Sequence, residues 1–278
     1  MKIRHNNYRS FVCFSIVLME LLLILGSCNQ PHSKGKIRHV KIRPVINIIV
    51  DSIAQYNQLN SSGVGYAGIR TVQWDRYEKL SKTATLPELR ELTNHKNSVV
   101  RCYAFDALTD RKDTAAFNIL LGHLQDTAMV STFIGCMISK ERTGDYFLNI
   151  VKPYDSTDTG YKLSFRQKAI VDSILLFDKH IMLYAKYNLL YDLKPQAQYY
   201  NRVKEIATNG KMPVSVWTLA KYKRLEDIGI ITKAFYGIES EDYAIRSVTL
   251  LPDSSFYPIL IKIFEREWKE KLYDYGKW

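Results

Sequence analysis

The chain has 278 residues, of which 46% are hydrophobic, and a formal net charge of +11 at pH 7. This length is enough for one large domain or two small ones with a substantial core. Four cysteines occur without a C-x-x-C pair or a Cys/His cluster, so neither a zinc site nor a dithiol redox motif is expected. Much of the excess positive charge lies near the N-terminus, which makes the chain a poor candidate for binding nucleic acid.

The first 28 residues have the pattern of a secretion signal. Residues 1–10 carry three basic side chains and no acid, and residues 11–26 are almost wholly apolar. A helix of that length spans about 24 Å, short of the ~30 Å hydrocarbon core, which favours residues 1–27 as a cleaved signal peptide. The last four residues, Leu25-Gly26-Ser27-Cys28, resemble the lipobox of bacterial lipoproteins. The resemblance implies cleavage before Cys28 and lipid on its sulfur; a plain signal peptide with an incidental cysteine is the alternative.

Residues 28–43 form a basic tether after the expected anchor. The segment has no acid, and its five basic residues are Lys34, Lys36, Arg38, Lys41 and Arg43. It can lie on anionic lipid headgroups or serve as a soluble linker, and the residues alone favour neither. Surface-exposed lipoproteins of some diderm bacteria carry acids just after the lipidated cysteine. By that resemblance, the acid-free segment 29–36 implies that the domain faces the periplasm. The expected anchor is in the outer membrane, and the residues leave the inner membrane open as the alternative.

From residue 44 onward, apolar residues recur with the 3.6-residue period of a helix and seldom with the two-residue period of a strand. Residues 60–68 and 152–161 interrupt the pattern as polar loops. Thr85 and Glu88 have the spacing of a capping box, and Asp113 can cap a later helix. The helices predicted in the first region, residues 44–151, cover residues 44–59, 71–82, 85–95, 98–108, 114–124 and 128–139.

Several of these segments are similar to one another. Residues 92–110 align with 121–139, and the pair Ile245-Arg246 aligns with Val100-Arg101. The segments resemble HEAT-like repeats, which implies an all-α fold, an α-solenoid of antiparallel helix pairs, with degenerate repeats in residues 152–278. In that family the arginines that open such helices, here Arg101 and Arg246, bind acids of neighbouring loops. Asp110 or Asp126 could serve, and binding of an anionic ligand is the alternative.

Residues 164–193 are strongly apolar and form either one long helix or two that separate near Asp178. Tyr184, Tyr187 and Tyr191 have the spacing of one helical face. Tyrosine combines an apolar ring with a polar tip, which suits protein interfaces and stacking on sugars. Packing in the core with solvated hydroxyls is the simpler interpretation.

Other candidate sites are weaker. Gly63, Gly65 and Gly68 spell G-x-G-x-x-G, but helical sequence on both sides favours a loop over a dinucleotide site. Cys102 and Cys136 could pair in an oxidising compartment, and the spacing leaves this open. No motif for catalysis, a metal or a cofactor is present, so no cofactor is expected.

The sequence therefore predicts a non-catalytic, membrane-anchored binding or scaffold protein of the cell envelope, with an envelope protein as partner. A glycan-binding lipoprotein that uses the tyrosine-rich surface is the first alternative. An envelope enzyme without a recognisable motif is the second.

Overall fold

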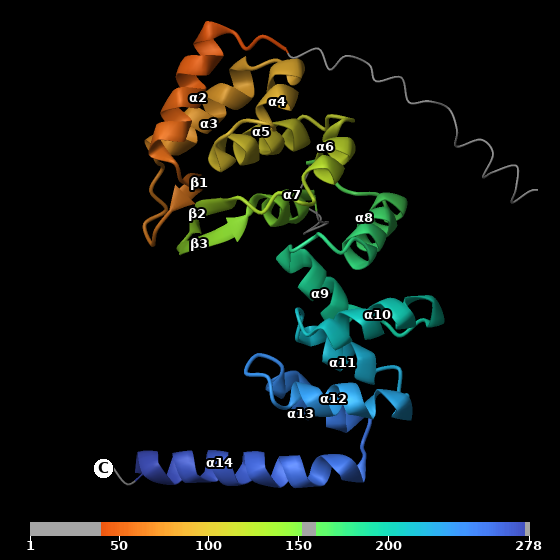
Figure 1. Cartoon of the computed structure of the whole chain (residues 1–278). Coiled ribbons are helices and arrows are strands. Elements are labelled where there is room, and N and C mark those ends of the chain that lie inside the picture. Colours follow the sequence, from red (N-terminus) through yellow and green to blue (C-terminus); the bar gives the residue numbers. More distant parts are fainter. Residues whose placement is uncertain (1–39, 152–159, 276–278) are drawn as a thin grey trace, which may run out of the picture. The chain divides into compact units, whose positions relative to one another are not determined.

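The computed structural model describes residues 40–151 and 160–275 (Figure 1). The predicted signal peptide, Cys28, the tether up to residue 39 and most of the loop 152–161 lie outside the described residues, so lipidation of Cys28 stays a prediction. The described chain is mostly helical, as expected. It also contains a three-stranded sheet, so the prediction of a purely α fold is wrong.

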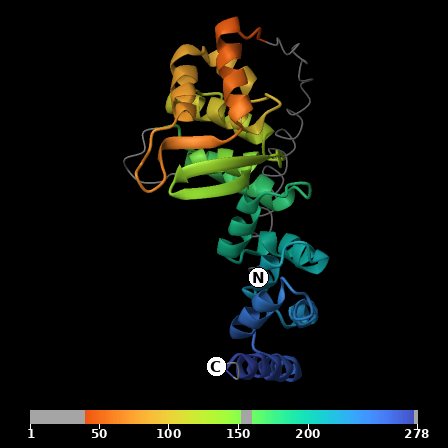
Figure 2. The same ribbon diagram turned by 90° about the vertical axis from the view of Figure 1, so that its left-hand side faces the viewer.

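The first region combines six helices with this sheet. Helices α3 and α5 pack against the strands and α2 packs on α3, and Figure 2 shows the sheet beneath these helices. The elements in chain order are α2 (Pro44–Tyr56), β1 (Leu59–Val64), α3 (Val72–Thr83), α4 (Leu86–Leu92), α5 (Ser98–Asp110), α6 (Ala116–Gly122), β2 (Met129–Gly135), β3 (Met137–Arg142) and α7 (Thr143–Val151).

Residues 128–139, predicted as a helix, instead form most of the antiparallel β2–β3 hairpin. Val130 and Thr132 are buried and alternate with less buried neighbours, which is the period of a strand with one covered face. The spacing of Val130 and Ile134 also fits one face of a helix, and this ambiguity explains the error. Gly135 takes φ of 54° at the turn, a conformation that favours glycine.

Residues 60–68, expected as a loop, contain most of β1, which runs parallel to β2 with Leu59 opposite Thr132. The sequence of β1 is mostly polar, and its position is set by a helix residue. The Tyr103 hydroxyl accepts the Asn60 N–H at 2.7 Å and donates to the Asn60 carbonyl at 2.9 Å. Both backbone polar groups of Asn60 are thereby satisfied by a tertiary contact that local sequence does not reveal.

The predicted capping box at α4 is confirmed. The Thr85 hydroxyl accepts the Glu88 N–H, and the Glu88 carboxylate accepts the Thr85 N–H at 2.9 Å. Arg43, the last tether residue, pairs with the same carboxylate at 2.7 Å. Its hydrogen bond holds the pKa of Glu88 well below the usual range. The tether is therefore fixed to the folded region at its last residue.

The second region consists of short helices. The segment 164–193 forms two helices that separate at Asp178, which is one of the two predicted arrangements. The elements are α8 (Phe165–Phe177), α9 (Tyr184–Asp192), α10 (Ala197–Asn209), α11 (Val214–Ala220), the 3₁₀ turn η1 (Leu225–Asp227), α12 (Ile228–Ala234), α13 (Glu241–Leu250), the 3₁₀ turn η2 (Ser254–Phe256) and α14 (Tyr257–Tyr275).

The apolar core of the described residues divides into three clusters along the chain. The first lies among α2 to α9, where the Phe105 and Phe147 rings stack with centroids 4.0 Å apart. The second surrounds Leu190 and Val203, and the third surrounds Phe256. Each cluster is built mainly from helices that follow one another in the chain, so most core contacts join helices that are near in sequence.

Candidate functional site

Arg101 has the structural role that the repeat resemblance implies. Its guanidinium is nearly buried, pairs with the Asp126 carboxylate at 2.9 Å and donates to the His95 carbonyl at 2.7 Å. Asp126 is thus the acid that Arg101 uses. Asp110 instead accepts the Tyr77 hydroxyl at 2.7 Å. The hydrogen bonds of the Arg101 guanidinium are made within the fold, which favours the structural role of Arg101 over binding of an anionic ligand.

Arg246 differs from its counterpart. It lies on α13 with an exposed side chain, and it makes no ion pair with any acid in the part of the chain that the structure describes. Arg101 lies in the first turn of α5, but Arg246 lies in the middle of α13 (Glu241–Leu250), so the prediction that both arginines open a helix is wrong for Arg246. Their contacts differ as well.

The predicted tyrosine face is present in part. The rings of Tyr184 and Tyr187 stack with centroids 5.2 Å apart and planes 11° from parallel. Tyr187 also meets Tyr243 edge-on at 6.2 Å. Tyr191 has a different neighbour, because the Lys221 ammonium lies over its ring at 5.9 Å. Tyr184 is 60% exposed, so one face of the stacked pair is available to a ligand.

A pocket of about 300 Å³ lies beside Tyr184, and we call it the tyrosine pocket. Asp145 at the start of α7 positions Tyr184 there, because its carboxylate accepts the N–H groups of Tyr184 and Ala185 at 2.9 and 2.8 Å. Burial raises the pKa of Glu141, which accepts a hydrogen bond from Asn149 at 3.1 Å. The lining residues are Met129, Lys140, Glu141, Arg142, Asp145, Asn149, Tyr184, Ala185 and Asn188.

This pocket joins an exposed aromatic ring to amide, carboxylate and cationic side chains. Such a set can stack on an apolar face of a ligand and form hydrogen bonds around its rim. Sequence analysis identified Tyr184 but not the residues of β3 and α7 beside it. They are about forty residues away in the chain and lie next to α9 through tertiary contacts, which include the hydrogen bonds of Asp145 and the packing of α7 on α9.

β3 is an edge strand with little cover. It pairs only with β2 among the strands of the described residues, and residues 137–140 are all exposed. Thr143 donates its N–H to the Ala128 carbonyl at 2.9 Å, which continues the ladder by one residue. Since bonding alternates along an antiparallel strand, the backbone groups of Ile138, Lys140 and Arg142 point away from β2. We call these groups the free edge of β3.

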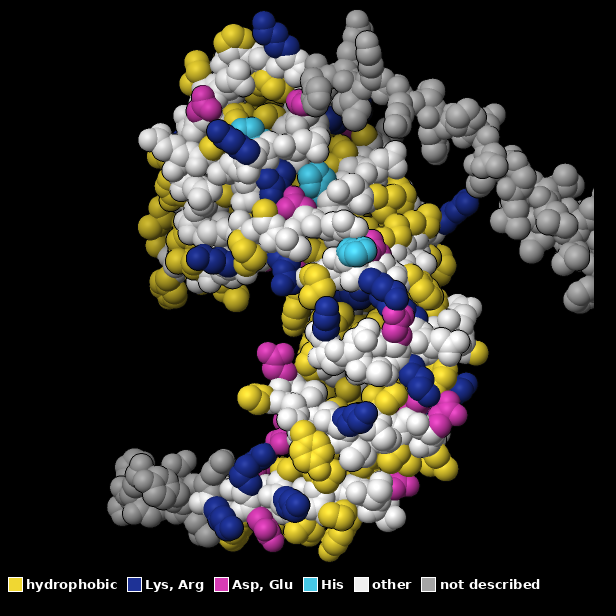
Figure 3. Space-filling view, in the orientation of Figure 1, with side chains coloured by type: hydrophobic (Ala, Val, Ile, Leu, Met, Phe, Trp, Pro, Cys, Tyr) yellow, Lys and Arg dark blue, Asp and Glu magenta, His cyan; other side chains and the backbone are white. Residues whose placement is uncertain are grey.

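The side chains near this edge are apolar to an unusual extent. Met137 is 73% exposed and Ile138 is 68% exposed, and Met129 and Ile134 on β2 are also exposed. Figure 3 shows hydrophobic side chains gathered on the side of the molecule where the sheet lies. Exposed apolar side chains gathered on one hairpin in this way are typical of interaction sites.

The glycine motif does not form a phosphate-binding turn. Gly63 belongs to β1, and Gly65 and Gly68 have φ of 71° and 61° in a tight turn that returns the chain to pair Val64 with Ile69. No helix begins within this turn. Among the described residues Cys102 and Cys136 are both free and do not pair, with Cys102 buried in α5 and Cys136 exposed at the hairpin turn.

Asp106 is a buried acid that no sequence motif marked. Its Oδ2 accepts the Tyr146 hydroxyl at 2.7 Å, and its Oδ1 is buried without a partner. Burial raises the pKa of Asp106 to about 8. The carboxyl is therefore protonated over most of the physiological pH range, and its protonation is coupled to folding.

Within residues 40–151 and 160–275, no cluster of three or more His, Cys, Asp or Glu side chains is placed to hold a metal ion. Over the same residues, no helix has the length and apolar character needed to cross a bilayer. No protein-family model, curated protein or solved structure matches the chain, so its function has to be inferred from the residues described above.

Proposed function

We propose that the protein is a lipid-anchored lipoprotein of the bacterial cell envelope, in the outer membrane facing the periplasm, and that its folded part is a non-catalytic binding module. The lipobox at Cys28 supports the anchor. The Arg43–Glu88 ion pair fixes the end of the tether to α4. Fourteen residues lie between Cys28 and Arg43, and the fifteen steps span at most about 50 Å when extended, so the tether keeps Arg43 within that distance of the lipid-bearing residue.

Replacing Cys28 tests the anchor. In Cys28→Ser the sulfur that accepts the lipid is absent, so incorporation of a labelled fatty acid should cease and the precursor should remain uncleaved and run larger on a gel. Labelling that persists in this variant would remove the anchoring proposal. Protease added to intact cells tests the orientation, because degradation of the domain while a periplasmic control survives would place it on the cell surface.

The observation that carries the binding proposal is the free edge of β3. An extended peptide can add to such an edge through main-chain hydrogen bonds, with side-chain contacts on alternate residues. Exposed Met137 and Ile138 would contact apolar side chains of that peptide, while Lys140 and Arg142 would favour acidic ones. The same two cations disfavour pairing with a second copy, as charges commonly do on natural edge strands. The partner is therefore an envelope protein with an extended, apolar and acidic segment.

A photo-reactive residue at position 137 tests this proposal in cells. Position 238 provides the matched control, because Ile238 is equally apolar and fully exposed but lies on the loop between α12 and α13. We expect one membrane-associated protein to be cross-linked from 137 and not from 238. Capture of the same proteins from both positions would contradict a specific surface, and capture of a second copy would identify a homodimer instead.

The variant Lys140→Pro tests whether the partner binds by main-chain hydrogen bonds to β3 or by side-chain contacts alone. The Lys140 N–H points to the free edge, so proline there removes a donor for a partner strand and leaves the β2–β3 bonds intact. We expect Lys140→Pro to fold normally and to lose the cross-link from position 137. Ser139→Pro is the contrasting variant, because its N–H bonds to β2 and its loss should destabilise the hairpin itself.

The repeat scaffold is part of the same proposal. In the second region each helix contacts helices near it in sequence, with α8 on α9, α9 and α10 on α11, and α11 on α13. Local contacts of this kind are typical of solenoids. We propose that these helices are degenerate HEAT-like repeats and that the β2–β3 hairpin replaces one helix of the pattern in the first region.

Glycan binding is the second candidate, and the stacked Tyr184–Tyr187 pair beside the tyrosine pocket is the observation that favours it. Affinity electrophoresis on envelope polysaccharides tests it with Tyr184→Ala and the control Tyr66→Ala, whose ring is exposed on the turn after β1. Retardation lost only in Tyr184→Ala would support a sugar site. Equal mobility of all three proteins on every polysaccharide would remove it.

A further inference from the structure

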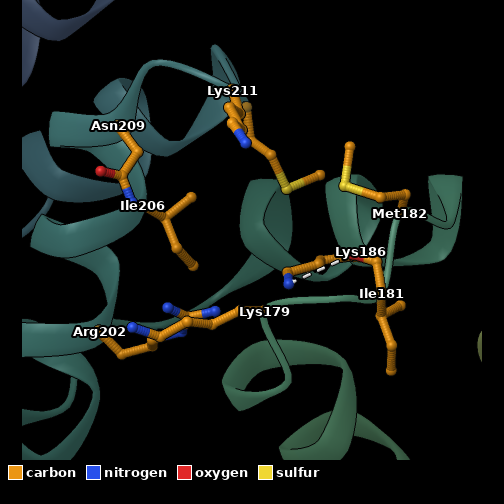
Figure 4. A pocket seen from close by; sticks show the side chains of 9 residues that line it. Lys179, Ile181, Met182, Lys186, Arg202, Ile206, Asn209 and Lys211 are labelled. Carbon is orange, nitrogen blue, oxygen red and sulfur yellow. Dashed lines mark hydrogen bonds between the residues drawn. The ribbon is translucent and has the colours of Figure 1, made fainter.

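A second cavity, separate from the tyrosine pocket, is lined by basic side chains. It has a volume of about 300 Å³ and lies between the segment that precedes α9, α9 itself, α10 and the turn after α10 (Figure 4). We call it the cationic cavity. It is lined by the basic residues Lys179, Lys186, Arg202 and Lys211 and by the apolar residues Ile206 and Met212, among others.

Lys186 is the central feature of this cavity. Only 3% of the residue is exposed, and its ammonium donates to the backbone carbonyls of Asp178 at 2.7 Å and Ile181 at 3.4 Å. Neutral carbonyls bind two of its three protons, and no carboxylate within the described residues forms an ion pair with it. A buried ammonium is costly unless a negative charge compensates it.

The neighbouring carboxylates supply only part of that compensation. Arg202 is 8% exposed, donates from Nε to the Leu176 carbonyl at 2.8 Å and pairs with Glu205 at 2.8 Å. Glu205 also binds Lys179, so one carboxylate serves two cations. Asp178 directs its carboxylate to the His180 N–H and to the Gln125 amide.

Lys211 adds a fourth cation, with no ion-pair partner in the described part of the chain. Against these four cations stand the carboxylates of Glu205 and Asp178, so the cavity and its rim have a net positive charge. Burial and the nearby Arg202 lower the pKa of Lys186 and outweigh the opposing charge of Asp178. A bound anion would act in the same direction as Asp178 and oppose both effects.

We propose that the cationic cavity binds an oxyanion group, a carboxylate or phosphate, that carries a short apolar substituent. The oxyanion accepts hydrogen bonds from Lys186 and from Lys211 at the rim, with Arg202 contributing attraction at short range. The apolar substituent lies against Ile206 and Met212. This site is distinct from the free edge of β3 and does not depend on strand addition there.

Titration calorimetry on the purified full chain in mild detergent tests the proposal with hexanoate, hexyl phosphate and 1-hexanol, each corrected for injection into detergent alone. The three probes share an apolar chain and differ in their head group. We expect both anions to bind and hexanol not to bind. The stronger of the two anions identifies the preferred head group. The proposal would be overturned if neither anion binds at millimolar concentration, or if hexanol binds as tightly as the anions.

Three variants locate the site. Lys186→Met keeps the apolar stem and removes the charge, and we expect a loss of affinity of about tenfold or more, as for a charged hydrogen bond. Lys211 is exposed, so Lys211→Met should leave the fold unaffected and test the cavity even if Lys186→Met fails to fold. We expect about threefold weaker binding in Lys211→Met. Lys194→Met, an exposed lysine on the loop between α9 and α10, is the control and should bind as the wild type does. Wild-type affinity in Lys211→Met and in a folded Lys186→Met would show that the anion binds elsewhere.

Discussion

Gly144 provides a sharp test of the packing between α7 and its surroundings. A Cβ added at this position would lie 2.6 Å from the His123 carbonyl oxygen and 2.9 Å from Leu183 Cδ1, closer than a methyl group is tolerated. The His123 carbonyl accepts the Asp126 N–H at 3.0 Å, and the Gly144 N–H donates to the Asp126 carbonyl at 3.0 Å. Both sides of the contact are therefore held in place.

The cost of Gly144→Ala follows from these distances. Overpacking costs about 1–3 kcal/mol, and the upper end applies because the nearest atom is a backbone carbonyl that cannot rotate away. The higher helix propensity of alanine than of glycine offsets up to about 1 kcal/mol of this cost. The free energy of unfolding should thus fall by about 2 kcal/mol, which lowers the Tm by roughly 4–8 °C in a domain of this size.

Thermal unfolding followed by circular dichroism measures this difference, with Gly122→Ala as the matched control. Gly122 is also helical, at the end of α6, but an added Cβ there meets no heavy atom within 4 Å. That variant should gain about 0.4–1 kcal/mol. A Tm for Gly144→Ala within 1 °C of the wild type, or equal losses in both variants, would refute the packing described for α7.

Three further predictions concern buried groups. Between about pH 4 and pH 8 the folded chain keeps a proton on Asp106 that the unfolded chain releases. The free energy of unfolding therefore falls by up to ~1.4 kcal/mol per pH unit as pH rises through this range. Asp106→Asn should flatten the dependence of Tm on pH over this range, and an unchanged slope would contradict the prediction. Arg101→Met leaves Asp126 without its buried partner and should cost about 3–5 kcal/mol in urea unfolding, whereas a loss below 1 kcal/mol would indicate an exposed pair. A maleimide should modify Cys136 in the native protein and Cys102 only after unfolding, as peptide mass mapping would show; rapid labelling of Cys102 would contradict its burial.

Elements with local signals could be predicted from the sequence. The capping pair Thr85 and Glu88 starts a helix in the structure as in the sequence, and the break at Asp178 follows from a change in local pattern. The β2–β3 hairpin could not be assigned, since the spacing of Val130 and Ile134 fits a helix as well as a strand. β1 depends on the Tyr103 hydroxyl, a contact across forty-three residues.

The candidate sites show the same division. Periodicity identified the pair Tyr184 and Tyr187, because both lie on one short helix. It could not identify Asp145, which positions Tyr184 from another helix. Lys186 has no sequence signature at all: its significance lies in burial against carbonyl groups without a carboxylate, which only the folded chain reveals.

Amide hydrogen exchange on β3 tests the central claim, that the protein recognises a partner by adding a strand at the free edge. The measurement compares the purified full chain alone and in complex with the protein cross-linked from position 137. Strand addition at the free edge requires that the amides of Ile138, Lys140 and Arg142 exchange rapidly in the free protein and at least about tenfold more slowly in the complex. Unchanged exchange at these three amides, with new protection on another surface of the domain, would contradict it.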